Sequence, residues 1–282
     1  TKKQLLAKHY LQKNKFMEQQ KKNFKIVSNT KTRVILPNIL TLVGVCIGLS
    51  SIKFALDAKY ELAIIAVIFA ALIDGLDGRI ARLIKGTSKV GKELDSLTDV
   101  ISFGVAPAFI MYFWHLNNLG KFGWLLCLIY VVCVALRLAR FNVSSNEEPS
   151  WKDNFFEGIP SPAGGILILM PLIYSLSEFK FINFNIKLTV PFLFVIISFL
   201  LISKFPTYSL KKIIVPRNLT IFLLFGIVLF FGLLLIYPFK IMFLFSLIYL
   251  CFIPISSMHY LKSKKIHDTV SFQDDDDHED IL

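Results

Sequence analysis

Residues 74–99 read DGLDGRIARLIKGTSKVGKELDSLTD and join the end of one long apolar run to the start of the next. Asp74 and Asp77 are three residues apart, and Asp95 and Asp99 are four apart, so each pair lies on one face of a helix. A carboxylate at the centre of a membrane-spanning helix costs roughly 2.5 to 3.5 kcal/mol on insertion scales. Because the connection is short, we expect two neighbouring antiparallel helices on which all four carboxylates converge.

The chain on either side of this stretch is strongly apolar. It has 282 residues, of which 55% are hydrophobic, whereas soluble domains are about 45–50% apolar. A membrane-spanning helix needs about 20 mostly apolar residues. The sequence therefore predicts an all-α polytopic membrane protein with about eight transmembrane helices. The apolar runs are 35–57, 61–83, 95–115, 122–141, 161–177, 188–204, 219–237 and 240–260.

The distribution of basic residues predicts the orientation of these helices. Residues 1–34 carry nine lysines and Arg33 against one acid, Glu18, and the loops at 84–93 and 204–218 are also basic. Since Lys and Arg collect on the cytoplasmic side, eight spans place both termini and the aspartate pairs at the cytoplasmic face. We attribute the net charge of +11 to contact with anionic lipid headgroups rather than nucleic acid. We expect no cleavable signal peptide, because the basic lead-in is long.

Four converging carboxylates predict a site for divalent cations. Carboxylates close together in a medium of low dielectric repel one another strongly, and Mg²⁺ or Mn²⁺ with oxygen ligands relieves that repulsion. Two such ions could clamp a pyrophosphate, and Arg82 could bind a phosphate with its planar guanidinium. Ion pairs with Arg79, Arg82 or Lys92 could explain one aspartate pair but not easily two. A divalent-cation transporter is an alternative, although it would spread its acids along a path.

One spacing in the chain is Asp74-x2-Asp77-Gly78-x2-Ala81-Arg82-x8-Gly91-x3-Asp95-x3-Asp99. It resembles the signature of the CDP-alcohol phosphotransferases. This resemblance implies an integral membrane enzyme with a six-helix core, usually a homodimer, that uses Mg²⁺ or Mn²⁺ to displace CMP with an alcohol. It implies that Asp74, Asp77 and Asp95 are metal ligands, and that Asp99 ligates metal and acts as the general base. The CDP site would be lined by Gly78, Ala81, Arg82 and Gly91.

Similarity over further segments of the chain indicates which alcohol accepts the transferred group. The segments 37–41, 93–108, 137–142, 156–163 and 202–207 are similar to those of the membrane-embedded CDP-diacylglycerol–serine O-phosphatidyltransferases. That similarity implies transfer of a phosphatidyl group from CDP-diacylglycerol to L-serine in phospholipid biosynthesis, giving phosphatidylserine and CMP. Glycerol 3-phosphate, inositol, inositol phosphate or choline as acceptor stays an alternative, because the carboxylate signature does not distinguish among them.

Other polar residues are candidates for substrate contacts. Arg137 and Arg140 lie three residues apart at the cytoplasmic end of the fourth run, where they hold a lipid phosphate or the serine carboxylate, or anchor the helix. Ser161 precedes a proline and is predicted as a helix N-cap and as a further substrate contact. Asn38 and Thr41 face the nucleotide, or serve capping and packing alone.

These observations divide the chain into four parts. We expect a basic cytoplasmic juxtamembrane arm at 1–34, a six-helix catalytic membrane core at 35–212, two additional transmembrane helices at 213–262, and an acidic, disordered tail at 263–282. Within the third apolar run, Pro107 is expected to kink the helix.

Overall fold

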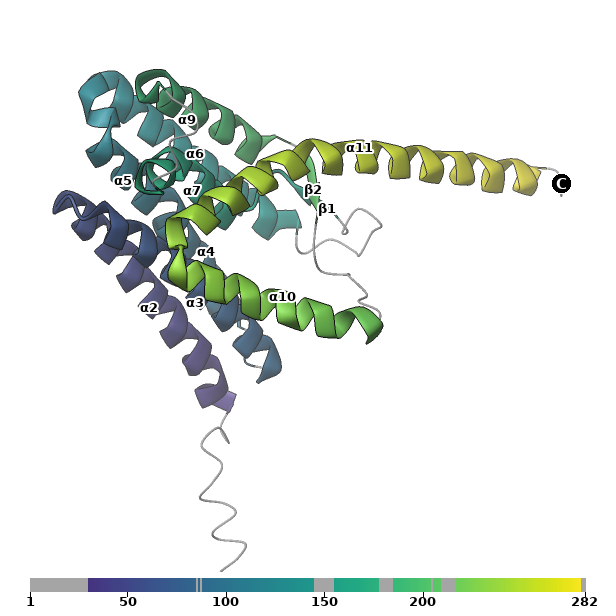
Figure 1. Ribbon diagram of the computed structural model, residues 1–282. Coiled ribbons are helices and arrows are strands. Elements are labelled where there is room, and N and C mark those ends of the chain that lie inside the picture. Colours follow the sequence, from purple (N-terminus) through teal and green to yellow (C-terminus); the bar gives the residue numbers. More distant parts are fainter. Residues whose placement is uncertain are drawn as a thin grey trace, which may run out of the picture.

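The computed structural model describes residues 30–84, 86, 88–144, 155–177, 185–203, 205–208 and 217–279. Helices packed side by side form a bundle, and α11 leaves it on one side (Figure 1). Most of the predicted basic arm at 1–34 lies outside the described residues. The elements are α2 Thr30–Leu56, α3 Tyr60–Leu83, α4 Lys89–Asp99, η1 Val100–Val105, α5 Ala106–Trp114, η2 Leu116–Leu119, α6 Lys121–Ser144, β1 Phe155–Glu157, α7 Ser161–Ile168, α8 Met170–Leu176, α9 Ile186–Ile202, β2 Pro206–Tyr208, α10 Arg217–Ile236 and α11 Pro238–Glu279.

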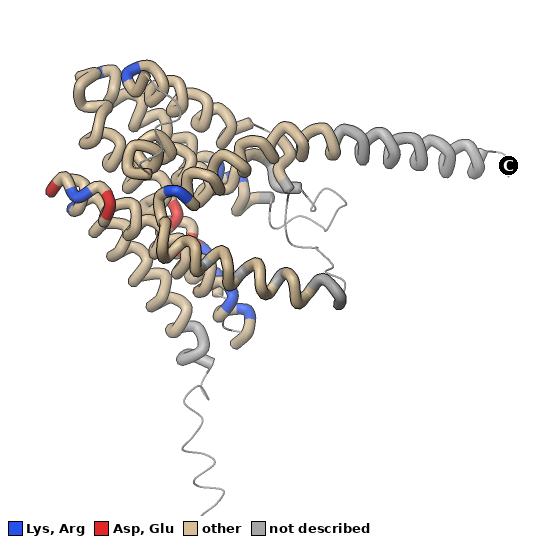
Figure 2. The backbone as a smooth tube through the Cα atoms, viewed as in Figure 1, with Lys and Arg blue, Asp and Glu red and all other residues tan. Residues whose placement is uncertain are grey.

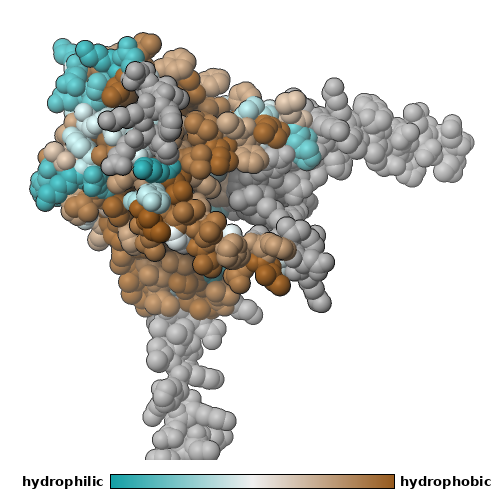
Figure 3. All heavy atoms as spheres, viewed as in Figure 1, coloured by the Kyte–Doolittle hydropathy of each residue, from teal (hydrophilic) through white to brown (hydrophobic). Residues whose placement is uncertain are grey.

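The helices have the length and composition expected of a polytopic membrane protein. Four helical stretches are long and apolar enough to cross a membrane, and two shorter apolar helices, Ile186–Ile202 and Thr220–Ile236, accompany them. Brown, apolar side chains cover much of the face seen in Figure 3, and Figure 2 shows acidic positions inside the bundle as well as at its edge. The predicted helical membrane fold is confirmed at this level. The long stretches are Ile35–Leu56, Lys89–Trp114, Lys121–Val143 and Pro238–Tyr260.

A short antiparallel ribbon accompanies the helices. Strand β1 pairs with β2, so that Phe156 lies opposite Thr207. Gly158 follows β1 with a φ of +73°, its N–H donates to Phe205 O at 2.8 Å, and its carbonyl accepts from Thr207 Oγ1 at 2.7 Å. Glycine adopts this φ without steric cost. The ribbon ties the chain entering α7 to the chain leaving α9, and thereby fixes where α7 begins.

The irregularity expected at Pro107 lies one turn earlier, in the π-helical segment η1. In an α-helix the carbonyl of Phe103 would accept from the N–H of residue 107, and proline has none. Tyr130 on α6 donates its hydroxyl to Phe103 O at 2.8 Å, and both residues are fully buried. Gly165 on α7 approaches the same segment so closely that a Cβ there would lie 3.1 Å from Phe103 O. The irregular segment after Asp99 is thus held by two other helices.

Helix α11 extends further than expected. It packs against α8 and β2, and its backbone is helical to Glu279, across most of the segment predicted as a disordered acidic tail. Adding a residue to an existing helix gains one hydrogen bond for each residue fixed, which explains why a helix that begins in the apolar run continues into a polar segment. Residues 280–282 lie outside the described residues.

Candidate active site

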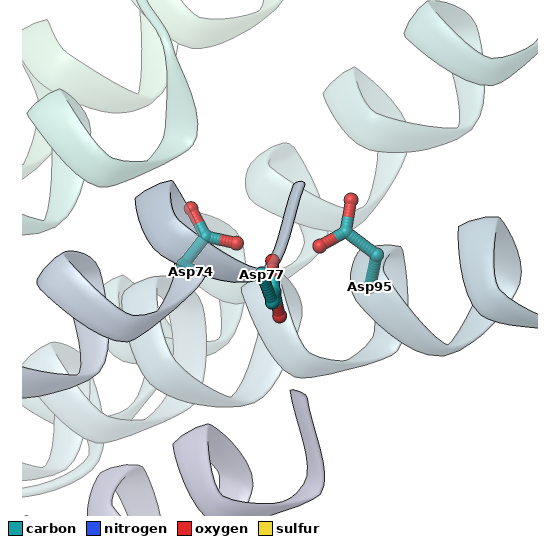
Figure 4. Close-up of side chains that lie close together, drawn as sticks. All are labelled: Asp74, Asp77 and Asp95. Atoms are coloured by element: carbon teal, nitrogen blue, oxygen red, sulfur yellow. The ribbon is translucent and has the colours of Figure 1, made fainter. Parts of the chain in front are cut away.

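Three of the four predicted carboxylates form one cluster. Asp74, Asp77 and Asp95 each offer an oxygen, and these oxygens all lie within 4.8 Å of one another. Figure 4 shows the first two on one helix and Asp95 on its neighbour, with the carboxylates turned toward the space between them. Asp77 is 3% exposed. The convergence predicted from the spacing of the aspartates is confirmed for these three residues.

The cluster forms because α3 and α4 both pack against α2. Ser88 precedes α4, and its Oγ accepts a hydrogen bond from Gly91 N at 2.9 Å, which caps the helix. From α2, Thr41 donates its hydroxyl to Asp77 Oδ2 at 2.7 Å. The sequence had suggested Thr41 as a nucleotide contact or as a capping and packing residue, and not as a partner of this carboxylate.

Asp99 lies beside the cluster rather than within it. It is close enough to Asp74 to interact electrostatically, and its Oδ2 accepts from Ser161 Oγ at 3.2 Å. Ser161 in turn accepts from Arg137 Nη1 at 3.1 Å. The other oxygen, Oδ1, is buried and has no hydrogen-bond partner among the described residues. No donor of the described chain therefore reaches Oδ1, and the carboxyl groups of Asp99 and Asp74 are themselves within hydrogen-bonding range of each other.

The N-cap prediction for Ser161 is wrong. Helix α7 begins at Ser161 with Pro160 in the cap position, and the helix has no side-chain cap bond. The hydroxyl instead turns toward Asp99, since α7 packs against η1, which directly follows Asp99.

These residues surround a cavity of about 800 Å³. Its wall includes Asn142, whose Nδ2 donates to Ser96 Oγ at 2.9 Å, a pair that sequence reasoning missed although Asn142 ends the noted segment 137–142. Arg140 lies off the wall and donates to Ile202 O at 2.8 Å, and Asp74 also lies off it. The predicted residues on the wall are Asn38, Thr41, Asp77, Gly78, Ala81, Arg82, Gly91, Asp95, Asp99, Arg137 and Ser161.

The donor set suits a divalent cation. Carboxylate oxygens are the ligands that Mg²⁺ and Mn²⁺ prefer, and three of them within 4.8 Å of one another repel in apolar surroundings unless a cation lies among them. Arg82, which was weighed as an ion-pair partner, donates its Nε to Gly78 O at 3.1 Å. Asp74, Asp77 and Asp95 are thus the residues that would hold a metal ion, with Asp99 beside them.

The chain is similar in sequence to several known proteins. The CDP-diacylglycerol–serine O-phosphatidyltransferase of Mycobacterium bovis is 34% identical over 233 residues, covering 79% of this chain and 78% of the relative. The enzyme of the same name from Helicobacter pylori is 38% identical over 191 residues, 67% of this chain and 78% of the relative. An archaetidylserine synthase of Methanothermobacter thermautotrophicus is 34% identical over 181 residues, which cover 60% of this chain and 68% of the relative.

The family model agrees with these relatives in the region that it covers. The model described as CDP-alcohol phosphatidyltransferase matches residues 34–209, which include all four aspartates and the whole wall of the cavity. This protein belongs to the CDP-alcohol phosphatidyltransferase family.

Proposed function

We propose that the protein transfers the phosphatidyl group of CDP-diacylglycerol to L-serine, giving phosphatidylserine and CMP. The relatives named CDP-diacylglycerol–serine O-phosphatidyltransferase support this reaction over most of the chain. The observation that carries it is the cluster of three carboxylates within 4.8 Å. Two of them, Asp77 and Asp95, line one cavity together with Asp99, Arg137 and Ser161. The protein thus presents a metal-binding side and an acceptor side in a single space.

In the proposed reaction the serine hydroxyl oxygen attacks the phosphorus that bears diacylglycerol. Asp99 takes the hydroxyl proton through Oδ1, the oxygen without a partner in the described part of the chain. The bond from that phosphorus to the bridging oxygen of the pyrophosphate breaks, and CMP leaves with the electron pair. A general base placed in this way contributes about 10²- to 10⁴-fold to the rate. When bound, Mg²⁺ or Mn²⁺, as two ions in our proposal, would neutralise charge on the pyrophosphate.

The CDP side of the cavity is formed by α2, α3 and the start of α4. A Cβ added to Gly78 would meet no described atom within 4 Å, so the backbone there is open for close approach of the nucleotide. Arg82, on the same wall, presents its guanidinium for a phosphate. The other residues assigned to this side are Asn38, Thr41, Ala81 and Gly91.

Replacing Gly91 with alanine should weaken binding of CDP-diacylglycerol. The new Cβ would lie 2.9 Å from Asn38 Oδ1 and 3.1 Å from Ser88 Oγ, so the wall residue and the helix cap must both shift. We expect the KM for CDP-diacylglycerol to rise by about 5- to 30-fold, equivalent to about 1–2 kcal/mol, with the KM for serine little changed. Gly226→Ala is the matched control, because a Cβ there meets no described atom within 4 Å. Equal kinetics for the two variants would contradict this role of Gly91.

The acceptor side is formed by α4, α6 and α7. Arg137 is 8% exposed yet lies on the cavity wall, and a guanidinium suits the carboxylate of serine because it donates two parallel hydrogen bonds. Ser161 links Arg137 to Asp99, so the group that binds the acceptor and the group that takes its proton are positioned together. Arg140 is not part of this side, because it bonds to Ile202 O on α9 and lies off the cavity wall.

The remaining expectations about membrane arrangement complete the proposal. We place the active site and both termini at the cytoplasmic face, with residues 35–212 as a six-helix core within eight spans and the protein as a homodimer. Helices α10 and α11 form the additional pair, and the lipid tails lie between helices. The family model at 34–209 and the four long apolar stretches support a multi-pass membrane core, and the basic segments at 1–34, 84–93 and 204–218 support the orientation.

The proposed reaction is tested by CMP release from purified protein in detergent with CDP-diacylglycerol and Mg²⁺ or Mn²⁺. We expect release when L-serine is added, with phosphatidylserine identified by mass spectrometry, and background release with glycerol 3-phosphate, inositol, inositol phosphate or choline. A faster reaction with any of these alcohols would identify that alcohol, rather than serine, as the acceptor. Metal flux into proteoliposomes without any CMP release would instead indicate a divalent-cation transporter.

A further inference from the structure

The segment that leads into α7, residues 158–160, is pressed against the end of α9. Helix α7 begins at Ser161, directly after this segment. A Cβ added to Gly158 would lie 2.9 Å from Leu201 O and 3.0 Å from Ser203 O, so the backbone of Gly158 approaches α9 more closely than a residue with a side chain could. Gly158 is buried, and its carbonyl therefore needs a hydrogen-bond partner inside the protein.

Thr207 on β2 supplies that partner. Its Oγ1 donates to Gly158 O at 2.7 Å, and Thr207 is 4% exposed. The N–H of Gly158 donates to Phe205 O at 2.8 Å, so residues 205–207 bind both backbone polar groups of the glycine. Valine has the same branched shape as threonine but no donor, and it would leave the buried carbonyl without this bond. The hydroxyl of Thr207 thus serves the lead-in to α7 rather than packing alone.

The chain that carries Thr207 is itself held in place from two sides. Helix α11 packs against β2, and the end of α9 is bound to α6, because Arg140 Nη1 donates to Ile202 O at 2.8 Å. One turn earlier on α6, Arg137 Nη1 donates to Ser161 Oγ at 3.1 Å. Helix α6, the end of α9, the ribbon and the start of α7 therefore form a closed ring of contacts.

Ser161 is the member of this ring that reaches the proposed acceptor groups. Its hydroxyl accepts from Arg137 and donates to Asp99 Oδ2 at 3.2 Å. Two residues separate it from Gly158: Ile159, which is fully buried, and Pro160, whose ring fixes its φ. Because these two residues have little freedom, a displacement of Gly158 is passed on to Ser161.

We propose that Thr207 is a positioning residue for the acceptor side of the cavity. Its bond to Gly158 O sets the start of α7 and thereby holds Ser161 between Arg137 and Asp99, although Thr207 itself lies off the cavity wall. The inference rests on the proposed function, since it assigns Arg137 and Asp99 to the acceptor alcohol. The CDP side, formed by α2, α3 and the start of α4, does not depend on the ribbon, so the effect should be selective.

The test is Thr207→Val in the full-length chain, assayed by CMP release. We expect kcat/KM for L-serine to fall by about 5- to 30-fold, while the KM for CDP-diacylglycerol and the Mn²⁺ titration curve stay unchanged. Thr207→Ser keeps the hydroxyl and should restore nearly wild-type kinetics, and Thr207→Ala provides a second variant without the hydroxyl. Unchanged kcat/KM for serine in the valine and alanine variants would overturn the assignment, as would an equal loss in Thr207→Ser.

Ser246→Ala is the matched control for a general weakening of the fold. Ser246 is 1% exposed on α11, its hydroxyl donates to Met242 O at 2.9 Å, and it lies off the cavity wall. Its replacement also removes one buried hydroxyl from a backbone carbonyl, and it should leave kcat/KM for serine unchanged even if the melting temperature falls. A loss in Ser246→Ala equal to that in Thr207→Val would exclude the positioning role.

A double-mutant cycle tests whether Thr207 acts through Ser161. Changes at coupled residues are not additive, so Thr207→Val combined with Ser161→Ala should have the same kcat/KM for serine as Ser161→Ala alone. Two losses that multiply would overturn the inference. If a different alcohol proves to be the acceptor, the same comparisons apply to its kcat/KM. A wild-type protein that releases no CMP with any alcohol would refute the proposed function, and this inference with it.

Discussion

Replacing Asp99 with asparagine should reduce CMP release by about 10²- to 10⁴-fold, the usual contribution of a general base, while CDP-diacylglycerol still binds. Asparagine has nearly the same shape, and its amide oxygen can still accept from Ser161 Oγ, which now lies 3.2 Å from Asp99 Oδ2. It cannot take the proton of the serine hydroxyl. The measurements are the initial rate of CMP release and binding of radiolabelled CDP-diacylglycerol to the detergent-solubilised variant.

Asp57→Asn is the matched control for this experiment. Asp57 is exposed and is paired with Lys53 at 2.5 Å in the turn between α2 and α3, far along α3 from the aspartate cluster. Its replacement should leave both rate and binding unchanged. Near-normal turnover by Asp99→Asn would show that another group accepts the proton, and a parallel loss of CDP-diacylglycerol binding would assign Asp99 to the nucleotide side instead.

Replacing Asp95 with asparagine should also abolish most of the activity, but for a different reason. It removes one of the three carboxylates whose oxygens lie within 4.8 Å of one another. A bound metal ion supplies several kcal/mol of charge stabilisation, and about 4 kcal/mol corresponds to about 10³-fold in rate. We expect a loss of at least about this size, together with a shift of the Mn²⁺ titration curve to higher concentration. Both the rate and Mn²⁺ binding by electron paramagnetic resonance should report the change.

Glu93→Gln provides the comparison on the same helix. Glu93 is exposed on α4 and lies off the cavity wall, so its loss removes the same charge without touching the cluster. The Mn²⁺ titration curve of Glu93→Gln should coincide with that of the wild type. If Asp95→Asn also follows the wild-type curve, the three carboxylates do not form the metal site.

The convergence of the carboxylates could be predicted because it depends on local spacing. Intervals of three and four residues fix one face of each helix, and a short connection forces the two helices to be neighbours. The structure confirms this for Asp74, Asp77 and Asp95. The same reasoning found Thr41 and Ser161 as polar residues near helix ends. Their actual partners, Asp77 and Asp99, lie on other helices.

Contacts between distant segments could not be predicted from spacing. Arg137 and Arg140 have the same residue type and lie one turn apart, yet one reaches the cavity wall and the other bonds to Ile202 O on α9. Which of them faces the substrate depends on where α9 packs, and a single sequence does not contain that information.

The hydrogen bond from Tyr130 Oη to Phe103 O also determines which half of the site can move. In apolar surroundings such a bond is worth about 4–6 kcal/mol, and no bulk solvent is at hand to exchange with it. Asp99 lies four residues before Phe103 and Arg137 seven residues after Tyr130, so both are carried by one stiff unit. The acceptor half of the site is therefore expected to stay rigid, so that the small amino acid meets a preformed template.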